Sequence, residues 1–332
     1  MVHSIDGMGP HDAGSDTHPE ALGPIDTIDH GMTHWEKHAN ALRMVVTGKD
    51  FGSLDEMRRA CEDLGERYYQ ISYFERQTEA LAKVMCEREK MSTPSLEKRM
   101  AEINQRFSAT PIVPLPELPE DHDHSADHFK EDEKGEGPNH HHLMNLAIQE
   151  LLQEQDLIRP EEVTRMIVNF DADYPNRGPK VVARAWLDSD YRARLLKDAR
   201  PAIEELGIDL EYQARIIALE NTPKIHNVVV CTLCSCYPRF LLGQPPTWYK
   251  SRSYRSRVVH EPRAVLKEFG TVLPKNVAIR VHDSNADMRY LVVPMRPVGT
   301  EDWSAQKLEK IVTRDCMIGV ALVDATIYDA AN

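Results

Sequence analysis

The first third of the chain carries apolar residues at helical spacing, with polar residues between them. Residues 34–46 and 54–91 show this pattern, and no proline interrupts either stretch. An amphipathic helix places apolar side chains at every third or fourth position. Ser95 is placed to cap a further helix that runs to about Phe107. We therefore predict a helical domain over residues 1–108.

Residues 109–142 break this pattern. Four prolines lie within residues 111–119 and exclude a continuous helix. Residues 111–142 contain nine acidic and two basic residues and six histidines, three of them at 140–142. Because so few apolar residues cannot offset the entropy lost on ordering, we expect a flexible linker. Its histidines have two open interpretations, namely capture and delivery of a metal ion, or a solvated spacer.

The last part of the chain begins with helical patterns and then changes to short β-rich runs. The helical patterns cover residues 143–157, a segment that begins at Pro160, and 181–206. The β-rich runs lie at residues 216–218, 228–230, 277–281, 290–293 and 318–323. Turn residues bound each run, as is typical of strands. Residues 143–332 are therefore predicted to be an α+β domain, in which a helical arm precedes small sheets.

Composition narrows the classes of function. The net charge is −13, from 40 basic and 53 acidic residues, which disfavours binding to nucleic acid. No apolar run approaches the ~18 residues of a membrane-spanning helix, and the N-terminus has no secretory signal pattern. We expect a cytoplasmic protein that binds neither nucleic acid nor a membrane.

Three of the six cysteines, Cys231, Cys234 and Cys236, lie within six residues. In a reducing cytoplasm such clustering favours metal binding or thiol chemistry over disulfides. The other three cysteines are predicted to be small core residues; they are Cys61, Cys86 and Cys316.

The predicted strand at residues 228–230 leads directly into this cluster, so the thiols converge only if the backbone curls around one point. The backbone amides of Ser235 and Cys236 then face the same point. Such a loop offers up to five ligands, three sulfurs and two nitrogens, and leaves one octahedral position open. This set suits trivalent cobalt or iron. A structural zinc site completed by Cys316 or a histidine is the alternative, because zinc prefers four ligands.

Residues 230–236, with the sequence VCTLCSC, resemble the metal-binding claw of the nitrile hydratase α subunit and the thiocyanate hydrolase γ subunit. The resemblance continues at residues 245–251, 254–259 and 312–321. The first part of the chain is similar to the N-terminal half of the β subunit of these enzymes. That similarity is carried by residues 11–12, 23–25, 35–36, 57–59 and 69–74. The chain thus resembles a fusion of half a β subunit with a whole α subunit, which implies the α-subunit fold for residues 143–332.

The resemblance implies a role for each residue of the claw. In the family the first cysteine stays a thiolate, the second becomes cysteine sulfinic acid and the third cysteine sulfenic acid. Carried over, these are Cys231, Cys234 and Cys236, and Ser235 contributes its amide nitrogen. Thr232 resembles the cobalt branch, because the iron branch has serine there. The implied cofactor is one non-corrin Co(3+) per chain, and Fe(3+) is the second choice.

The resemblance also implies the reaction, which is addition of water across C≡N to convert a nitrile to an amide. Cys236 and Ser235 are the implied catalytic residues of the claw. Arg58 is placed to bind the sulfur oxygens and Tyr73 to position the substrate, and Arg59 is the fallback for Arg58. Another interpretation of Arg58 is a surface ion pair with a nearby acidic residue at helical spacing; the candidates are Asp55 and Glu62.

Two other functions stay open. Arg239 and Gln244 look more like the thiocyanate hydrolase branch, which converts thiocyanate to carbonyl sulfide and ammonia. A non-catalytic cobalt-binding protein is the second alternative. The expected partners are a separate chain that supplies the C-terminal β-barrel of a β subunit, a small nitrile or thiocyanate, and a metallochaperone. The resemblance therefore implies a hetero-oligomer.

Overall fold

The computed structural model describes residues 10–16, 18–109, 138–210 and 214–326, which form two compact units. The helical unit is Met32–Ile167, and the sheet unit combines Met1–Gly31 with Val168–Asn332. These divisions differ from the domain boundaries expected from sequence. The start of the chain belongs to the sheet unit. The helix His140–Glu154 belongs to the helical unit and begins inside the predicted linker, so the prediction of a flexible segment is wrong for its last three residues. Most of that linker, residues 110–137, lies outside the described residues.

The helical unit is built from amphipathic helices whose starts are capped by side chains. Thr33, Ser53 and Ser72 each accept a hydrogen bond from the backbone three residues later, and a glutamate at that position bonds back. The helices pack around one apolar core. Along the chain they are α1 (His34–Gly48), α2 (Leu54–Glu62), η2 (Gly65–Tyr69), α3 (Tyr73–Glu87), α4 (Thr93–Ala109), α5 (His140–Glu154) and α6 (Pro160–Val168).

The stretch 54–91 is not one helix, as its pattern alone suggested. Gly65 has a left-handed φ of 55° and Ser72 caps a new helix, so the stretch divides into α2, η2 and α3. The predicted cap of α4 is also wrong by three residues. The backbone N–H of Ser95 donates to the hydroxyl of Ser92, 3.2 Å away, so Ser92 caps this helix.

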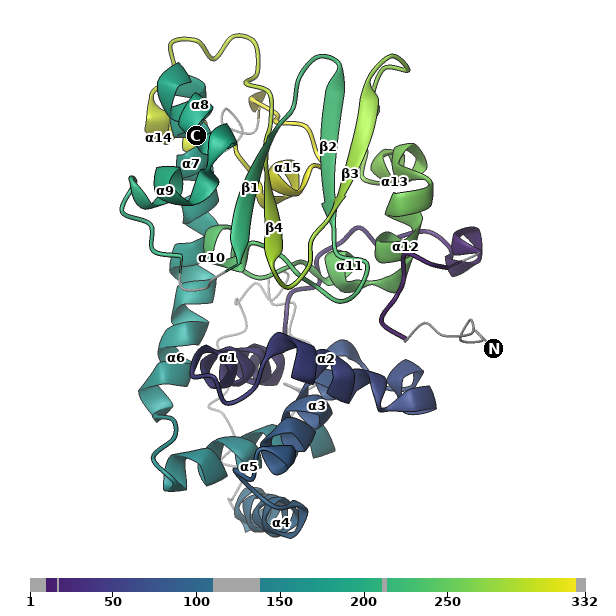
Figure 1. The fold of residues 1–332 in the computed structure, drawn as a ribbon, viewed down its shortest axis with the longest axis vertical. Helices are drawn as coiled ribbons and strands as arrows, with labels where there is room; N and C mark the ends of the chain where they lie inside the picture. Colours follow the sequence, from purple (N-terminus) through teal and green to yellow (C-terminus); the bar gives the residue numbers. More distant parts are fainter. Residues whose placement is uncertain (1–9, 17, 110–137, 211–213, 327–332) are drawn as a thin grey trace, which may run out of the picture. The chain divides into compact units, whose positions relative to one another are not determined.

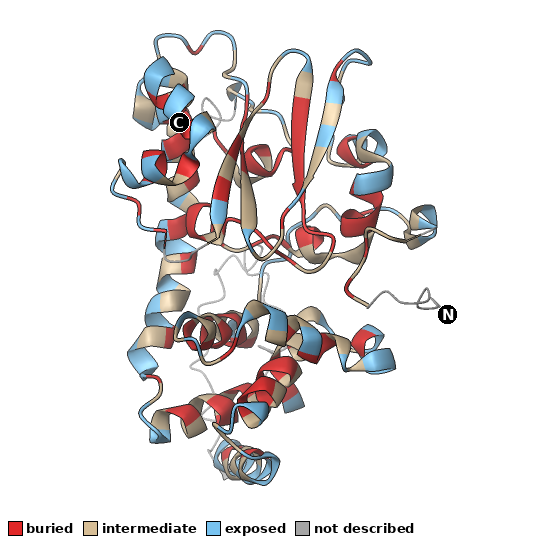
Figure 2. Ribbon diagram, in the orientation of Figure 1, coloured by how far each residue is buried: buried red, intermediate tan, exposed pale blue. Residues whose placement is uncertain are grey.

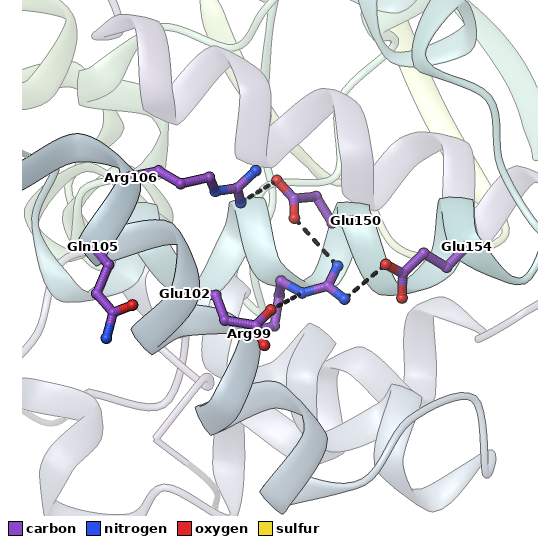
Figure 3. Close-up of a pocket in the computed structure, with 6 residues that line it drawn as sticks. All are labelled: Arg99, Glu102, Gln105, Arg106, Glu150 and Glu154. Atoms are coloured by element: carbon purple, nitrogen blue, oxygen red, sulfur yellow. Dashed lines mark hydrogen bonds and ion pairs between the residues drawn. The ribbon is translucent and has the colours of Figure 1, made fainter. Parts of the chain in front are cut away.

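Ion pairs join α4 to α5. Arg99 contacts Glu150 at 3.2 Å and Glu154 at 2.7 Å, and Arg106 contacts Glu150 at 2.6 Å. Figure 3 shows these side chains lining a shallow pocket between the two helices. Because the charges in it pair with one another, we interpret the pocket as part of the helix packing.

The sheet unit holds four strands and several short helices (Figure 1). The 3₁₀ and π segments are η1 (Pro19–Leu22), η5 (Asn169–Asp173) and η6 (Tyr174–Asn176). The first helices are α7 (Arg177–Leu187), α8 (Ser189–Lys197) and α9 (Ala199–Glu204). The later helices are α10 (Arg239–Leu242), α11 (Thr247–Lys250), α12 (Arg252–His260), α13 (Pro262–Glu268), α14 (Ala305–Glu309) and α15 (Arg314–Ile318).

The strands form two parallel pairs. They are β1 (Arg215–Glu220) with β4 (Met288–Val293), and β2 (Ile225–Val230) with β3 (Ala278–Asp283). Figure 2 shows β2 buried along most of its length, as its run of valines predicts. In the register of the second pair, Val230 lies opposite Asp283, so the ends of these two strands meet.

Four of the five β-rich runs are strands, and the prediction of a strand at 318–323 is wrong. Thr313 caps α15, which ends at Ile318, and Gly319 then turns the chain with a φ of 93°. A Cβ atom on Gly319 would lie 2.0 Å from the carbonyl oxygen of Asn227. Ile318 and Val320 are buried in this segment, whereas Leu322 is 50% exposed, and α15 packs against β2 and β4.

The fold is α+β, with helices and small parallel sheets around the cysteine cluster, as predicted. Among the described residues, no helix is long and apolar enough to cross a membrane.

Candidate metal centre

The cysteine loop begins where β2 ends. Cys231 follows Val230 directly, and the chain then curls so that Cys234 and Cys236 return to the same point. The Sγ atoms of Cys231 and Cys234 are 3.6 Å apart, and those of Cys234 and Cys236 are 3.4 Å apart. The backbone N–H of Cys234 also donates to the sulfur of Cys231, over 3.2 Å. The structure therefore brings together the three sulfurs that the sequence predicted.

These thiols are held away from water. Cys231 and Cys236 are buried and Cys234 is half-buried, and all three are free cysteines. Burial raises the pKa of the Cys231 thiol well above its usual value. A hydrogen bond with Cys231 lowers the pKa of Cys236, but the hydrogen bond with Cys234 and burial outweigh it and raise that pKa to about 12. Since a metal ion binds the thiolate form, its binding must displace these protons.

The donor set fits a thiophilic transition metal. Sulfur ligands favour such ions over calcium or magnesium, which prefer oxygen. Among the described residues, no fourth cysteine, histidine or carboxylate joins the three sulfurs. A closed zinc site needs four such ligands. The group as observed therefore suits a site completed by backbone nitrogens better than a structural zinc site.

One side of the loop is fixed by Asp283, at the end of β3. Its two carboxylate oxygens accept from the backbone N–H of Thr232 at 2.9 Å and from the Thr232 hydroxyl at 2.5 Å. The sequence analysis missed Asp283. The available signal was its position directly after a strand, because parallel strands bring their carboxyl ends to one edge of a sheet.

Side chains of α11 and α12 hold the loop carbonyls. Arg255 donates to the carbonyl oxygens of Cys231 at 3.1 Å and Thr232 at 2.5 Å, and Tyr249 donates to that of Cys236 at 2.8 Å. Both side chains are buried. Burial raises the pKa of Tyr249 well above its usual value, so this hydroxyl stays a donor. The basic and aromatic run at 249–257 thus supports the loop.

Two arginines of the sheet unit affect the pKa of groups in the cysteine loop or next to it. Arg289, on β4, lowers the pKa of Cys236 by its charge, although burial and Cys234 outweigh this effect. Arg239 begins α10, three residues after Cys236; burial raises the pKa of the neighbouring Tyr237 well above its usual value, and the charges of Arg314 and Arg239 oppose this only in part. The sequence analysis named Arg239 but not Arg289.

Arg58 and Tyr73 lie in the helical unit. Arg58, on α2, forms an ion pair with Asp55 at 3.0 Å, as the alternative interpretation of this residue predicted. Tyr73 begins α3, and its ring meets that of Phe74 edge-on at 5.0 Å between centroids. Their catalytic roles stay predictions.

Two of the remaining three cysteines lie in the core, as predicted. Cys61 and Cys316 are buried, and Cys86 is half-buried. Cys316 accepts a hydrogen bond from the Thr313 hydroxyl at 3.1 Å and donates to the carbonyl oxygen of Leu322 at 3.3 Å. This thiol therefore helps to close the end of α15.

Comparison with known proteins finds two families along the chain. Residues 139–321 match the family described as nitrile hydratase, alpha chain, and residues 9–130 match the N-terminal part of the nitrile hydratase beta subunit. The high-molecular weight cobalt-containing nitrile hydratase subunit alpha of Rhodococcus rhodochrous is 50% identical over 177 residues, which are 53% of this chain and 87% of the relative. The thiocyanate hydrolase subunit gamma of Thiobacillus thioparus is 42% identical over 194 residues, which are 54% of this chain and 79% of the relative.

A solved structure shares the fold of this region. A double mutant of the Fe-type nitrile hydratase from Comamonas testosteroni Ni1 is 43% identical, with a TM-score of 0.51. The similarity covers 53% of this chain and 87% of the solved one. The part of the chain that holds the three thiols is thus similar to proteins named for cobalt and for iron.

Proposed function

The chain belongs to the nitrile hydratase alpha-chain family, and we propose that it is the metal-binding subunit of an enzyme that adds water across a C≡N bond. The first proposed substrate is a nitrile, which the reaction converts to an amide. The observation that carries this proposal is the group of three thiols, held by Arg255 and Tyr249 in a loop that closes around one point.

The proposed cofactor is one non-corrin cobalt(III) ion per chain. Its ligands would be the sulfurs of Cys231, Cys234 and Cys236 and the backbone nitrogens of Ser235 and Cys236. Thr232 and the cobalt-containing relative from R. rhodochrous support cobalt, and the similarity to an Fe-type enzyme keeps iron(III) as the second choice. When bound, such an ion supplies Lewis acidity that polarises the triple bond.

The chain's own residues would prepare the site and orient the reactants. We propose that an external oxidant such as dioxygen oxidises Cys234 by four electrons to a sulfinic acid and Cys236 by two electrons to a sulfenic acid, while Cys231 stays a thiolate. Oxidation gives the sulfurs oxygens that accept hydrogen bonds. The Cys236 oxygen and the Ser235 hydroxyl would then orient the substrate and water. Arg58 would bind the sulfur oxygens, because a guanidinium donates to two oxygens at once.

The proposed assembly is a hetero-oligomer. The second family match concerns the N-terminal part of a beta subunit. We propose that a separate chain supplies the C-terminal β-barrel of that subunit and completes the substrate pocket. A metallochaperone that delivers cobalt is a further proposed partner.

Thiocyanate hydrolysis is the second candidate function. The positive charge of Arg289 acts on Cys236, and Arg239 follows the claw by three residues in the chain; both would favour an anionic substrate. The similarity to the T. thioparus thiocyanate hydrolase subunit points the same way. A non-catalytic cobalt-binding protein is the third candidate, and it predicts exchangeable metal and unoxidised cysteines.

The products distinguish the three candidates. The chain is co-expressed in cobalt medium with the barrel partner, and the purified complex is incubated with a nitrile or with thiocyanate. An amide that accumulates supports the first proposal. Formation of carbonyl sulfide and ammonia from thiocyanate would support the second candidate in place of the first. No turnover, together with unmodified thiols, leaves only the third.

Arg58 and its neighbour Arg59 provide a matched test of the sulfur-binding arginine. Arg59 pairs with Glu87 on the exposed face of α2 and α3. We expect Arg58→Lys to lower kcat by about a hundredfold, as loss of a charge-stabilising donor does, and Arg59→Lys to leave it unchanged. Metal content is measured in both. Equal activity of the two variants would remove Arg58 from the mechanism.

A further inference from the structure

The first described residues of the chain pack on the metal-binding loop of the same unit. These residues, 10–16 and 18–31, are called here the N-terminal arm. They fall within the match to the beta subunit, yet they join the compact unit that holds the cysteines. An element similar to the beta subunit and a metal loop similar to that of the alpha subunit therefore belong to one polypeptide chain.

The arm touches the loop at the residue next to the first cysteine. The backbone N–H of Ala13 donates to the carbonyl oxygen of Thr232 at 3.0 Å. Arg255 donates to that same oxygen and also to the carbonyl oxygen of His11, so one guanidinium ties the arm to the loop. Ala13 is 0% exposed and His11 4% exposed. This contact is thus an interior one.

Gly14 brings the arm into close contact with the loop. A Cβ atom at this position would lie 3.0 Å from the methyl carbon of Thr232. The carboxylate of Asp12 accepts from the backbone N–H groups of Gly14 and Ser15 at 3.0 and 3.2 Å and so fixes the turn. A Cβ atom at position 14 therefore requires Thr232 to give way by a few tenths of an ångström, and a larger side chain requires more.

Further contacts hold the arm in place on α12. Arg252 donates to the carbonyl oxygen of Pro10 at 3.1 Å and forms an ion pair with Asp16. Farther along, Arg257 donates to the carbonyl oxygen of Gly23 at 2.8 Å, and Figure 1 draws η1 beside α12. The arm is therefore anchored on both sides of the segment that meets the loop.

The loop has a physical need for such support. Thr232 lies between the first two cysteines of the loop, so a movement of Thr232 would also move the sulfur atoms. Asp283 holds Thr232 through its N–H and hydroxyl, and the arm holds its carbonyl oxygen. The two contacts together leave this residue little freedom to move.

We propose that residues 10–16 clamp the metal-binding loop, and that the chain retains a thiolate-bound transition-metal ion only while the clamp is docked. Because the clamp belongs to the same chain, retention does not require the barrel partner. This inference rests on the proposed metal centre.

The test measures metal release from the full chain without its partner. Wild type, Gly14→Ala and Gly14→Val are loaded without oxygen with cobalt(II), which exchanges its ligands readily, and are mixed with excess chelator; the loss of the absorption of the metal–sulfur bonds is followed with time. Gly48→Val is the matched control, since a Cβ there meets no atom within 4 Å. We expect release to be several-fold faster in Gly14→Ala and at least tenfold faster in Gly14→Val, with the control unchanged.

A second readout does not depend on the metal. In the metal-free chain, Gly14→Val should increase the rate at which Cys231 reacts with an alkylating reagent, while thermal melting shows that the unit stays folded. If Gly14→Val does not fold, Asp16→Asn removes an anchor of the clamp without adding bulk, and Glu20→Gln on the same arm is its control.

The outcomes separate the two ideas. A wild-type chain that takes up no transition metal would contradict the proposed metal centre. A wild-type chain that holds metal, with Gly14→Val and Asp16→Asn releasing it no faster, would overturn the clamp and leave the metal centre intact.

Discussion

His38 is a mostly buried histidine of α1, and its environment opposes protonation. Burial lowers its pKa from 6.5 to about 4, against a hydrogen bond with Gln149 that favours the protonated ring, and the nearby His142 and His34 add to the lowering. Asn145 contacts its ring nitrogen at 2.5 Å. The folded helical unit therefore holds this histidine neutral.

The helical unit should lose stability in mild acid because of His38. Between pH 6.5 and 4 the unfolded chain binds a proton at this position that the folded chain does not, so the free energy of unfolding falls as the pH falls. The shift corresponds to a loss of up to about 3 kcal/mol. Urea unfolding of wild type and His38→Gln across this range should show a shallower pH dependence in the variant, with the exposed His34→Gln as control. Parallel curves for all three proteins would contradict this account.

At position 319 both the backbone conformation and the close packing disfavour any residue other than glycine. Gly319 has a left-handed φ and lies against the carbonyl of Asn227, whereas Gly270 has a similar φ of 79° and no atom within 4 Å of its Cβ position. Gly270→Ala should cost about 1 kcal/mol from conformation alone. Gly319→Ala should cost about 2 kcal/mol more, because β2 must move. Thermal unfolding of the two variants measures the difference, and equal losses would show that the close approach has no effect.

At the scale of elements, the pairing of α4 with α5 depends on Arg99. Its side chain is 16% exposed and contacts glutamates on both helices, whereas that of Lys98 is 79% exposed. We expect Arg99→Ala to destabilise the helical unit by about 1 kcal/mol and Lys98→Ala to have little effect. Hydrogen exchange of the α5 amides reports the change. Equal protection in both variants would show that apolar contacts alone hold the pair.

Helices and buried strands were predictable from the sequence where one local pattern dominates. The valines of β2 and the spacing in α1 are such cases. The run at 318–323 was not, because α15 ends within it at Ile318 and Gly319 then turns the chain, which the apolar pattern alone does not indicate. The break between α2 and α3 depends on Ser72, whose capping of a new helix is a stronger signal than the continuous apolar spacing around it.

At the scale of the whole molecule, the sequence predicted the sulfurs of the site and the packing of residues 249–257 under them, but not Asp283 or the arm. Cys231, Cys234 and Cys236 are close in the chain, and their spacing is informative by itself. Asp283 and the arm reach the loop from distant positions, and only the paired ends of β2 and β3 and the path of residues 10–16 bring them there. Contacts of this kind depend on topology, which a local pattern does not contain.

The account as a whole depends on an oxidised, metal-loaded claw. The most direct measurement is metal analysis of protein matured with its partner in cobalt medium, combined with mass spectrometry of the peptide that contains Cys231, Cys234 and Cys236. We predict about one cobalt per chain, two oxygens added at Cys234 and one at Cys236. Zinc or no metal, with three unmodified thiols, would contradict the enzyme and leave a structural or metal-carrying loop.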